Sequence, residues 1–309
     1  MTSPEISVVM PVYNASATLG ATIASILAQT FAVDELIIID DGSTDDSLKQ
    51  LLELAASDER IRLVARENGG VSSARNLGVK LAKAPLIAFI DADDIWDPRK
   101  IAHHLALHRD DPGLAASYAR IAFIGQDADG LAGAKTVSSL GPERLKLADV
   151  LGENPVCTAS NMVVRRDWFL YSGGFDESLS FAEDQEFVAQ IIARGGRVEG
   201  IDAVLTGYRF SPDGLSANFG RMYQGWRNVA ERYLEGSILA SLDALYCRYL
   251  ARRVLRGGGS PLLVLHYVMR GLRIDAATFL RERRRGISTL IGAIAAPFMP
   301  ARMRRRVFA

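Results

Sequence analysis

Cysteine is scarce in this chain of 309 residues, which has only Cys157 and Cys247. The two lie far apart and lack the close spacing of metal-ligand cysteines, which excludes a zinc site built on cysteine pairs. So few thiols also argue against a disulfide-stabilised secreted domain and fit a reducing compartment. We expect both side chains to be packing residues.

Long apolar runs are missing as well. None reaches the roughly 20 residues that a membrane-spanning helix needs. The N-terminal sequence MTSPEISVVM has no basic region followed by a long apolar stretch, so we expect no signal peptide. These absences predict a cytoplasmic protein.

Histidine is rare too, with four side chains. His104 and His108 share one face of a predicted helix, a spacing that can bind zinc. No further ligand accompanies them. The sequence therefore favours a solvated helix face over a metal site.

Lysine is absent after residue 218, where arginine is the basic residue. Residues 219–309 hold 17 Arg and 5 acids, a net charge of +12, whereas residues 1–218 hold 19 Lys+Arg and 31 Asp+Glu, a net charge of −12. Opposite charge in two segments indicates different partners for each. We expect an acidic catalytic domain over 1–218 and an arginine-rich helical extension over 219–309.

Short β-branched runs alternate with amphipathic segments along the first part of the chain. Strands are predicted at 6–12, 35–40, 60–65 and 86–90, and helices after Ser16 or Thr18, after Ser43 or Thr44, over 72–82 and over 98–110. This alternation predicts an α/β fold with a mostly parallel central sheet flanked by helices. Further strands are expected at 114–124 and 157–166, a helix at 184–196, and a closing block at 197–210. GGGSP (257–261) should divide the helical extension in two.

Three carboxylates, Asp91, Asp93 and Asp94, follow the apolar run LIAFI (86–90). In open α/β sheets, ligands bind beyond the carboxyl ends of the strands. Acids gathered there repel one another unless a cation lies between them. Oxygen ligands suit Mg²⁺ or Mn²⁺, which would also carry a substrate phosphate. Capping of the next helix explains Asp97, but not Asp91 and Asp93.

Two further segments offer nucleotide contacts. Asp40 and Asp41 end the second predicted strand, where a carboxylate can accept a hydrogen bond from a ribose hydroxyl or a base N–H. NGGVSSARN (68–76) puts two glycines before a helix, whose N–H groups favour phosphate, and Arg75 adds a positive side chain. The first strand is not followed by GxGxxG, so a dinucleotide site is not expected.

Glu183 and Asp184 lie at the start of the predicted helix near 184–196. Acids favour a helix N-terminus for electrostatic reasons alone. Either residue could equally be a general base that takes a proton from an attacking hydroxyl. The residues themselves leave both interpretations open.

Six motifs occur in order along the chain: PVYN (11–14), AQTF (28–31), DDGSTD (40–45), NGGVSSARN (68–76), DADD (91–94), and GGFDE followed by ED (183–184). Together they resemble the family 2 glycosyltransferases over the first 210 residues. The resemblance implies the GT-A fold of nucleotide-diphospho-sugar transferases, with nucleotide-sugar binding in 1–110 and the acceptor side in 111–218.

The resemblance also implies roles for single residues. Asp184 matches the catalytic base of inverting members, Asp93 matches the metal ligand of the DXD motif, and Asp91 would lie near ribose and metal. Asp41 would contact the base, usually uracil, and the cofactor would be Mn²⁺ or Mg²⁺. The other nucleotide-sugar contacts would be Pro11, Val12, Tyr13, Asn14, Asn68, Gly69, Arg75 and Ala92, with Asp94, Glu183, Trp96 and Arg209 as secondary candidates.

Two departures from the family pattern matter. Tyr208-Arg209 is followed by FSPDG, without the histidine that some relatives carry there, so the metal shell would depend on Asp93, phosphates and water. Processive members carry a Gln-x-x-Arg-Trp signature, whereas this chain has QGWR (224–227). We therefore expect a single sugar transfer per encounter.

The segment 281–306 places a mostly apolar stretch between two arginine clusters. It could lie in the interface of an anionic membrane, or pack as a core helix with its arginines in solvent. We favour the membrane surface, at the inner face of the cytoplasmic membrane. No recognition motif or aromatic platform indicates nucleic acid, and the sequence does not indicate an oligomeric state.

The sequence thus predicts a metal-dependent, inverting, non-processive glycosyltransferase. Its favoured donor is a UDP-sugar, and its acceptor is a hydroxyl of a glycan or lipid-linked molecule. One rival is a nucleotidyltransferase. Such enzymes usually need a glycine-rich loop with a basic residue directly after the first strand, whereas this chain has PVYNASATLG (11–20) there, without a basic residue. The other is a non-catalytic scaffold that binds nucleotide or membrane.

Overall fold

The computed structural model describes residues 5–132, 134, 136–209, 218–257, 259–300, 303, 304 and 307. The chain divides into two compact units, which are described one at a time. Unit 1 comprises Met1–Lys146 and Pro155–Phe210, and unit 2 comprises Leu147–Asn154 and Ser211–Ala309. The short segment 147–154 thus groups with the C-terminal helices, which a single division at residue 218 does not provide for.

Within the described residues, unit 1 contains one mixed sheet. Its strands are β1 (Ile6–Val12), β2 (Glu35–Asp40), β3 (Ile61–Ala65), β4 (Leu86–Phe89), β5 (Ile95–Trp96), β6 (Ala116–Ile124), β7 (Thr136–Val137), β8 (Val163–Arg165) and β9 (Val198–Arg209). The first half is parallel, in the order β3-β2-β1-β4. The path continues β8-β6-β9-β5, where only β6 and β9 pair in parallel, and β7 pairs with β6.

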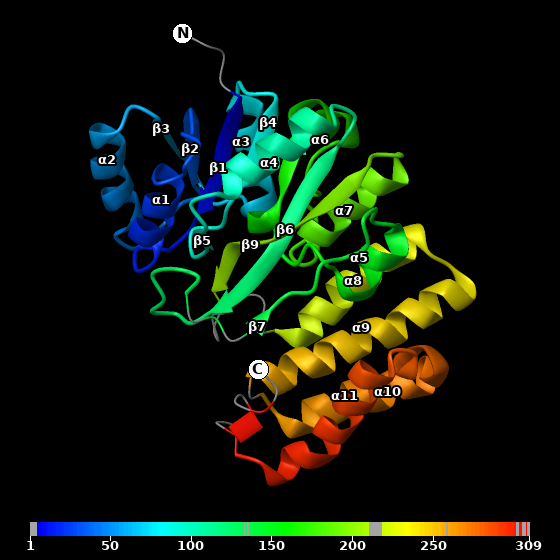
Figure 1. Ribbon diagram of the computed structural model, residues 1–309. Coiled ribbons are helices and arrows are strands. Elements are labelled where there is room, and N and C mark those ends of the chain that lie inside the picture. The colour runs from blue at the N-terminus through cyan, green and yellow to red at the C-terminus, as the bar shows by residue number, and fades with distance from the viewer. Residues whose placement is uncertain are drawn as a thin grey trace. The chain divides into compact units, whose positions relative to one another are not determined.

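Helices flank this sheet, as the α/β prediction requires (Figure 1). They are α1 (Leu19–Leu27), α2 (Ser47–Ser57), α3 (Val71–Leu81), α4 (Lys100–Asp110), α6 (Arg166–Ser172) and α7 (Glu183–Ala193), with a 3₁₀ turn η1 (Ala159–Asn161). Strands β1, β2 and β3 are each followed directly by a helix, because a parallel connection must cross back over the sheet.

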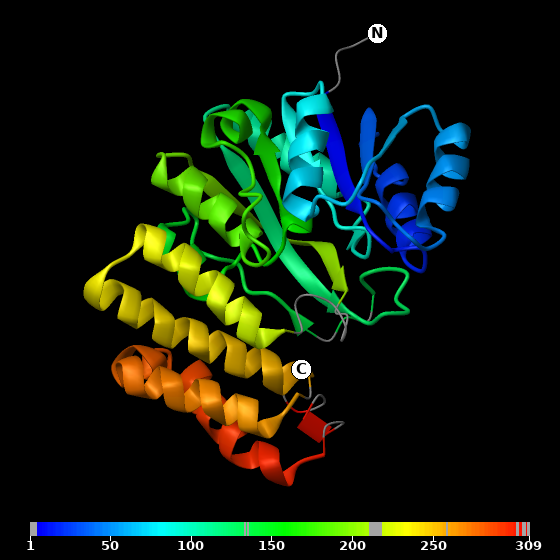
Figure 2. The same cartoon turned by 180° about the vertical axis from the view of Figure 1, so that it is seen from behind.

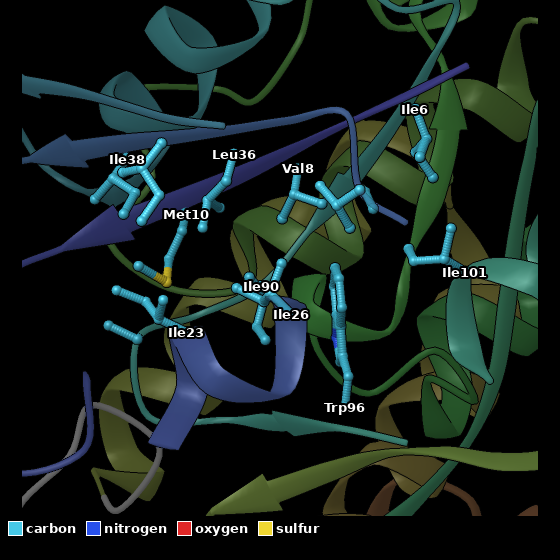
Figure 3. Packing of buried hydrophobic residues seen from close by; sticks show 14 of the residues in the cluster. Ile6, Val8, Met10, Ile23, Ile26, Leu36, Ile38, Ile90, Trp96 and Ile101 are labelled. Atoms are coloured by element: carbon cyan, nitrogen blue, oxygen red, sulfur yellow. The ribbon is translucent and has the colours of Figure 1, made fainter. Parts of the chain in front are cut away.

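Alternation along β1 decides which side chains enter the main core. Every second residue from Ile6 to Val12 points to one face and is at most 1% exposed. Ile23 and Ile26 of α1 and Ile101 of α4 meet them there (Figure 3). Burying each such aliphatic side chain contributes about 1.5–3 kcal/mol, so this layer fixes β1 between its neighbours.

The opposite face of the parallel strands is covered by α3 (Figure 2). A Cβ at Gly78 would lie 2.4 Å from Cγ1 of Val9, so only glycine permits this close packing of α3 on β1. The helix begins at Val71, just beyond β3. Its N-terminal turns, which carry Arg75, therefore lie toward the carboxyl ends of the strands.

Two local predictions are wrong. α2 begins at Ser47 with Asp46 at its N-cap, so neither Ser43 nor Thr44 caps it. The stretch 157–166 is not one strand but η1, β8 and the start of α6. The side chain of Thr158 accepts a hydrogen bond from Ser160 N, and such local bonds compete with extended structure.

The predicted solvated face of α4 is also wrong. Lys100, His104 and His108 lie one turn apart on the buried side of the helix, at 0%, 0% and 5% exposure. The rings of His104 and His108 lie 2.7 and 3.0 Å from Ser117 Oγ on β6. Lys100 Nζ lies 3.2 Å from His104 Nε2 and donates to Asn161 O. These polar groups bond to one another inside unit 1.

Unit 2 is helical in its described part. Its helices are α5 (Leu147–Glu153), α8 (Phe219–Tyr233), α9 (Gly236–Gly257), α10 (Pro261–Leu280) and α11 (Arg283–Ala295), with a 3₁₀ turn η3 (Ala296–Phe298). The predicted break at 257–261 is confirmed, because α9 ends at Gly257 and Pro261 begins α10. These two long helices run side by side (Figures 1 and 2).

A buried tryptophan holds the first helices of unit 2 together. Trp226 of α8 is 0% exposed and stacks on Tyr246 of α9, with ring centres 4.5 Å apart. Its Nε1 donates to the carbonyl of Leu151 in α5 at 2.7 Å. Across the ranges that the structure describes, no helix is both long and apolar enough to span a bilayer.

The free energy of unfolding should depend on pH through the buried histidines. Burial, followed by the charge of Arg165, lowers the pKa of His108 from 6.5 to about 4. Between these values the unfolded chain binds a proton that the folded chain does not. Stability must therefore fall as the pH falls through this window, by about 1.4 kcal/mol per pH unit for each such histidine.

Urea unfolding at a series of pH values checks this expectation. His108→Gln should flatten part of the dependence. His103→Gln, on the exposed side of the same helix, should leave it unchanged. Identical slopes for the wild type and both variants would contradict the assignment.

Candidate active site

The parallel strands bring the predicted residues to one edge of the sheet. β1 ends at Val12, β2 at Asp40, β3 at Ala65 and β4 at Phe89. The carboxyl ends of parallel strands face the same way, and this edge is where open α/β sheets bind ligands. The segments that follow these four ends form the candidate site.

Asn14 connects the loop after β1 to the loop after β2 through hydrogen bonds. Its Oδ1 accepts hydrogen bonds from the N–H groups of Thr44 at 2.8 Å and Asp45 at 3.3 Å, and its own N–H donates to Ser43 Oγ at 3.1 Å. Its φ of 51° is left-handed, which asparagine tolerates better than most residues. The Asn14 side chain is thus used within the protein, whereas the neighbouring Tyr13 is 54% exposed.

Asp41 is buried and strongly hydrogen-bonded. Its carboxylate accepts from Arg66 Nε at 2.6 Å, Gly69 N at 3.0 Å and Gly70 N at 2.8 Å. Asn68 Nδ2 donates to its carbonyl at 2.9 Å. A carboxylate has about four acceptor positions, so roughly one remains for a ligand. Arg66 was not identified from the sequence, although its place directly after the third strand was a usable signal.

The three clustered aspartates have different surroundings. The Asp91 N–H donates to Ser160 Oγ at 2.9 Å, and its carboxylate accepts from Thr158 Oγ1 at 3.3 Å. Among the described residues, none other than Asp93 itself donates to the Asp93 carboxylate. Burial, then the charge of Asp91, raises the pKa of Asp93 to about 6. Nothing in the sequence spacing indicated Thr158 and Ser160.

Arg75 joins the acidic strand end to the acidic helix start. It is 3% exposed, and it donates to Asp91 Oδ1 at 2.5 Å and to Glu183 Oε1 at 3.1 Å. Its guanidinium also lies 5.1 Å from the ring centre of Phe175. The positive charge predicted to lie near the nucleotide therefore holds two carboxylates of the protein in place.

Asp184 lies in the first turn of α7. The preceding Ala182 has a left-handed φ of 62°, an uncommon conformation for alanine that concentrates at functional sites. Burial, then the charge of Glu183, raises the pKa of Asp184 to about 7, and Arg75 opposes this rise. A carboxylate with such a pKa can take a proton near neutral pH.

Arg209 supports the acidic loop through backbone contacts. Its N–H donates to Asp94 Oδ1 at 2.9 Å, and its side chain donates to the carbonyls of Asp93 at 2.7 Å, Gly125 at 3.1 Å and Gln126. Asp94 is 1% exposed, and burial followed by the charges of Asp93 and Asp91 raises its pKa. Arg209 thus fixes where the aspartates lie.

Four other predicted residues, Pro11, Val12, Ala92 and Trp96, have buried side chains. The Trp96 ring lies in the core (Figure 3), and its Nε1 donates to Ser160 O at 2.9 Å. The carbonyl of Ala92 accepts from Thr18 Oγ1 at 2.8 Å. Val12, Ala92 and Trp96 thus belong to the buried core beneath the site, and we assign Trp96 to packing.

The carboxylates present would fit a divalent cation whose remaining coordination positions were filled by a substrate phosphate and water. In the part of the chain that is described, no three His, Cys, Asp or Glu side chains are grouped to hold a metal ion unaided. Asp91 and Asp93 offer hard oxygen ligands. Mg²⁺ commonly takes one or two carboxylates with substrate phosphates and water, and Mn²⁺ also suits carboxylate oxygens.

Arg75→Met should destabilise the protein by about 3 kcal/mol or more, because it leaves Asp91 and Glu183 unpaired beside other acids. Arg75→Lys should restore part of this loss. Denaturant unfolding gives the values. Arg99→Met removes an exposed pair with Asp97 and should change stability little. If Arg75→Met cost no more than that control, the bridge would have no structural role.

Known proteins resemble this chain in sequence and in fold. The model of glycosyl transferase family 2 matches residues 7–171, more than half of the chain. Chondroitin synthase from Escherichia coli is 31% identical over 188 residues, which are 61% of this chain and 26% of that protein. The Escherichia coli UDP-Glc:alpha-D-GlcNAc-diphosphoundecaprenol beta-1,3-glucosyltransferase WfgD is 42% identical over 103 residues, 33% of this chain and 40% of WfgD. The chain thus spans less than half the length of either relative.

Two solved structures have the same fold at low sequence identity. S. aureus TarS 1-349 in complex with UDP has a TM-score of 0.59 and 20% identity, and the likeness covers 98% of this chain and 91% of that one. Mannosyltransferase PcManGT from Pyrobaculum calidifontis, in complex with GDP-Man and Mn²⁺, has a TM-score of 0.63 and 18% identity, with 100% and 85% covered. The predicted GT-A fold is confirmed, and the chain belongs to glycosyltransferase family 2.

Proposed function

We propose that this glycosyltransferase is an inverting, metal-dependent enzyme that moves one sugar from a UDP-sugar to a hydroxyl acceptor. The observation that carries the proposal is the double ion pair of Arg75, which joins the DXD aspartate Asp91 to Glu183, the neighbour of Asp184. The buried guanidinium of Arg75 therefore connects the donor side of the site to the start of α7, which carries Asp184, the acid that would take the proton.

Asp184 is the catalytic base in this proposal. Its raised pKa supports that role, since a base with a pKa near the working pH transfers protons most effectively. The acceptor hydroxyl gives its proton to Asp184 as its oxygen attacks the anomeric carbon. The bond from that carbon to the nucleoside diphosphate breaks on the opposite face, which inverts the configuration in one displacement.

Asp93, with Asp91, would hold Mn²⁺ or Mg²⁺ against the donor diphosphate. When bound, the ion supplies positive charge to the leaving diphosphate. No other described residue donates a hydrogen bond to the Asp93 carboxylate, which supports this assignment. Arg75 and the backbone contacts of Arg209 keep the two aspartates in position before the donor arrives, so little reorganisation is needed during reaction.

The donor nucleotide would lie over the ends of β1 and β2. The exposed ring of Tyr13 can stack on a base, and the remaining acceptor position of Asp41 can receive the N3–H of uracil. UDP in TarS and UDP-Glc in the name of WfgD support a uridine donor. Because the acceptor named for WfgD is a lipid diphosphate, a lipid-linked or glycan acceptor is favoured here.

The rival functions have weaker support. A nucleotidyltransferase needs a basic loop after the first strand, whereas residues 13–18 are YNASAT, and Asn14 is bonded to the next loop. A non-catalytic scaffold does not need a base with a raised pKa. Single transfer, rather than processive synthesis, remains part of the proposal.

We also propose that α11 rests on an anionic membrane. Ile287, Ile291 and Ile294 are 45%, 59% and 62% exposed, at a spacing that puts them on one face of α11. Phe298, in the turn η3 that follows, is 86% exposed. Residues 283–309 hold seven arginines and no acid. An apolar stripe beside excess arginine is typical of helices that lie in the membrane interface. This would hold the enzyme at the inner face of the cytoplasmic membrane.

Melting temperatures with a panel of nucleotides should separate the donor from its rivals. UDP with Mn²⁺ should raise the melting temperature more than GDP, CMP or either component alone, because ligands that bind the folded state stabilise it. Asp93→Asn should lose the metal-dependent part, whereas Asp110→Asn, at the far end of α4, should keep it. No shift with any uridine nucleotide would overturn the donor assignment.

Asp184→Asn should retain UDP binding and lose turnover by about 10²-fold or more. In the wild type, kcat/KM should fall tenfold per pH unit below about pH 7, because protonated Asp184 cannot accept a proton. Release of UDP from a UDP-sugar with an acceptor measures both effects. Turnover that survives in Asp184→Asn with an unchanged pH profile would exclude this base.

Sedimentation with vesicles tests the membrane surface. Replacing Ile291 and Ile294 together by Asp should weaken binding to phosphatidylglycerol vesicles by at least about tenfold for each residue, given about 1.5–3 kcal/mol per buried isoleucine. Ile238→Asp, an equally exposed isoleucine of α9, should have little effect. Equal loss in both proteins, or binding to phosphatidylcholine alone, would contradict the proposal.

A further inference from the structure

A row of arginines runs along one side of α9. Arg248, Arg252 and Arg256 are spaced four residues apart, which places their side chains on neighbouring turns of one helical face. Arg248 is 0% exposed. Arg285 of α11 belongs to the same cluster, because it shares a carboxylate with Arg248.

The two carboxylates in this cluster are already engaged. Glu153 accepts from Arg248 at 2.9 Å through Oε1 and from Arg285 at 2.6 Å through Oε2. Glu282 accepts from Arg248 at 2.7 Å and lies 3.2 Å from Arg285. Both acids therefore serve Arg248 and Arg285, and neither forms an ion pair with Arg252.

Arg252 is the unusual member of the row. In the described part of the chain it has neither a hydrogen-bond nor an ion-pair partner, although it is partly buried. Burial, then the charges of Arg256, Arg285 and Arg248, lowers its pKa to about 10, and Glu153 opposes this only in part. A bound anion would stabilise a half-buried guanidinium that lies among like charges.

We propose that Arg252, together with Arg256 and Arg285, binds a phosphate or diphosphate group. The planar guanidinium matches phosphate oxygens in a bidentate manner, and a doubly charged anion offsets the excess positive charge better than chloride does. A structural role alone does not explain the site, since Arg252 bonds to nothing that it could hold in place. The proposal concerns unit 2 and does not depend on the donor or the base in unit 1.

The phosphate could come from two sources, a lipid headgroup or a free phosphorylated molecule. The exposed apolar stripe of α11 lies in the same unit and gives the first source a physical route. The chemistry recognised is the same in both cases. Separate arms of one experiment distinguish them.

Thermal unfolding with inorganic pyrophosphate is the primary test. EDTA is present throughout, so that metal-dependent binding in unit 1 does not contribute, and sodium chloride at equal ionic strength is the salt control. The variant is Arg252→Gln, and the matched control is Arg273→Gln, which removes an exposed charge from α10. Arg252→Lys keeps the charge but loses the bidentate geometry.

Pyrophosphate should raise the melting temperature of the wild type and of Arg273→Gln, raise that of Arg252→Lys less, and leave Arg252→Gln unchanged. Without pyrophosphate, Arg252→Gln should melt no lower than the wild type, because it relieves repulsion among like charges. An equal pyrophosphate shift in all four proteins, or no shift beyond the salt control in the wild type, would overturn the site.

Phosphatidylglycerol vesicles identify the source. If Arg252→Gln sediments with them less than Arg273→Gln does, and the pyrophosphate response is also lost, the headgroup phosphate is the ligand. If the two variants sediment equally and only the pyrophosphate response is lost, the site takes a free phosphorylated molecule. Both results support the phosphate site, and a variant that loses neither response refutes it.

Discussion

The double ion pair of Arg75 is the constraint on which the candidate active site depends. Asp91, Asp93 and Asp94 follow the end of strand β4, and Glu183 and Asp184 begin a helix that comes much later in the chain. Five acids at one edge would repel one another if no cation lay between them. A buried guanidinium that bonds to one acid from each group makes their approach possible, and the close packing of Gly78 on Val9 holds its helix in place.

One arginine does not neutralise this cluster. The pKa values of Asp93 and Asp184 remain raised, each by burial first and by a neighbouring acid second. The remaining negative charge is consistent with a site that a divalent cation and a diphosphate complete. The same excess suits the proposed chemistry, since burial and this excess together raise the pKa of Asp184 to about 7, where a carboxylate can take a proton near neutral pH. Unit 2 has an excess of positive charge instead, because its arginines outnumber its acids. A bound anion would offset this excess.

Much of this architecture could be predicted from the sequence. The apolar runs ending in Asp40 and at LIAFI (86–90) indicated parallel strands with acids at their ends, and the ordered motifs indicated the family and the GT-A fold. Contacts between distant residues could not be predicted in the same way. Arg75 and Glu183 are separated by 108 positions, and no local pattern links them.

The burial of several polar side chains was the other feature that could not be predicted from the sequence. The sequence predicted a solvated face at His104 and His108, because hydrophobic patterns assign polar side chains to water. These two and Lys100 are buried because Ser117 and the carbonyl of Asn161 provide partners that only the folded sheet brings near. Arg66 escaped notice for a related reason, since its role is to hold Asp41 and this depends on a hydrogen bond between loops.

We propose above all that the acidic edge of the sheet binds a divalent ion together with a diphosphate. Electron paramagnetic resonance of free Mn²⁺ measures this directly, because protein-bound Mn²⁺ loses most of its solution signal. We expect the protein alone to bind Mn²⁺ weakly. When UDP is also present, the protein should bind more Mn²⁺ than UDP itself does, and Asp93→Asn should lose this added binding. Mn²⁺ binding that is equally strong without UDP, or unchanged in Asp93→Asn, would contradict the proposal.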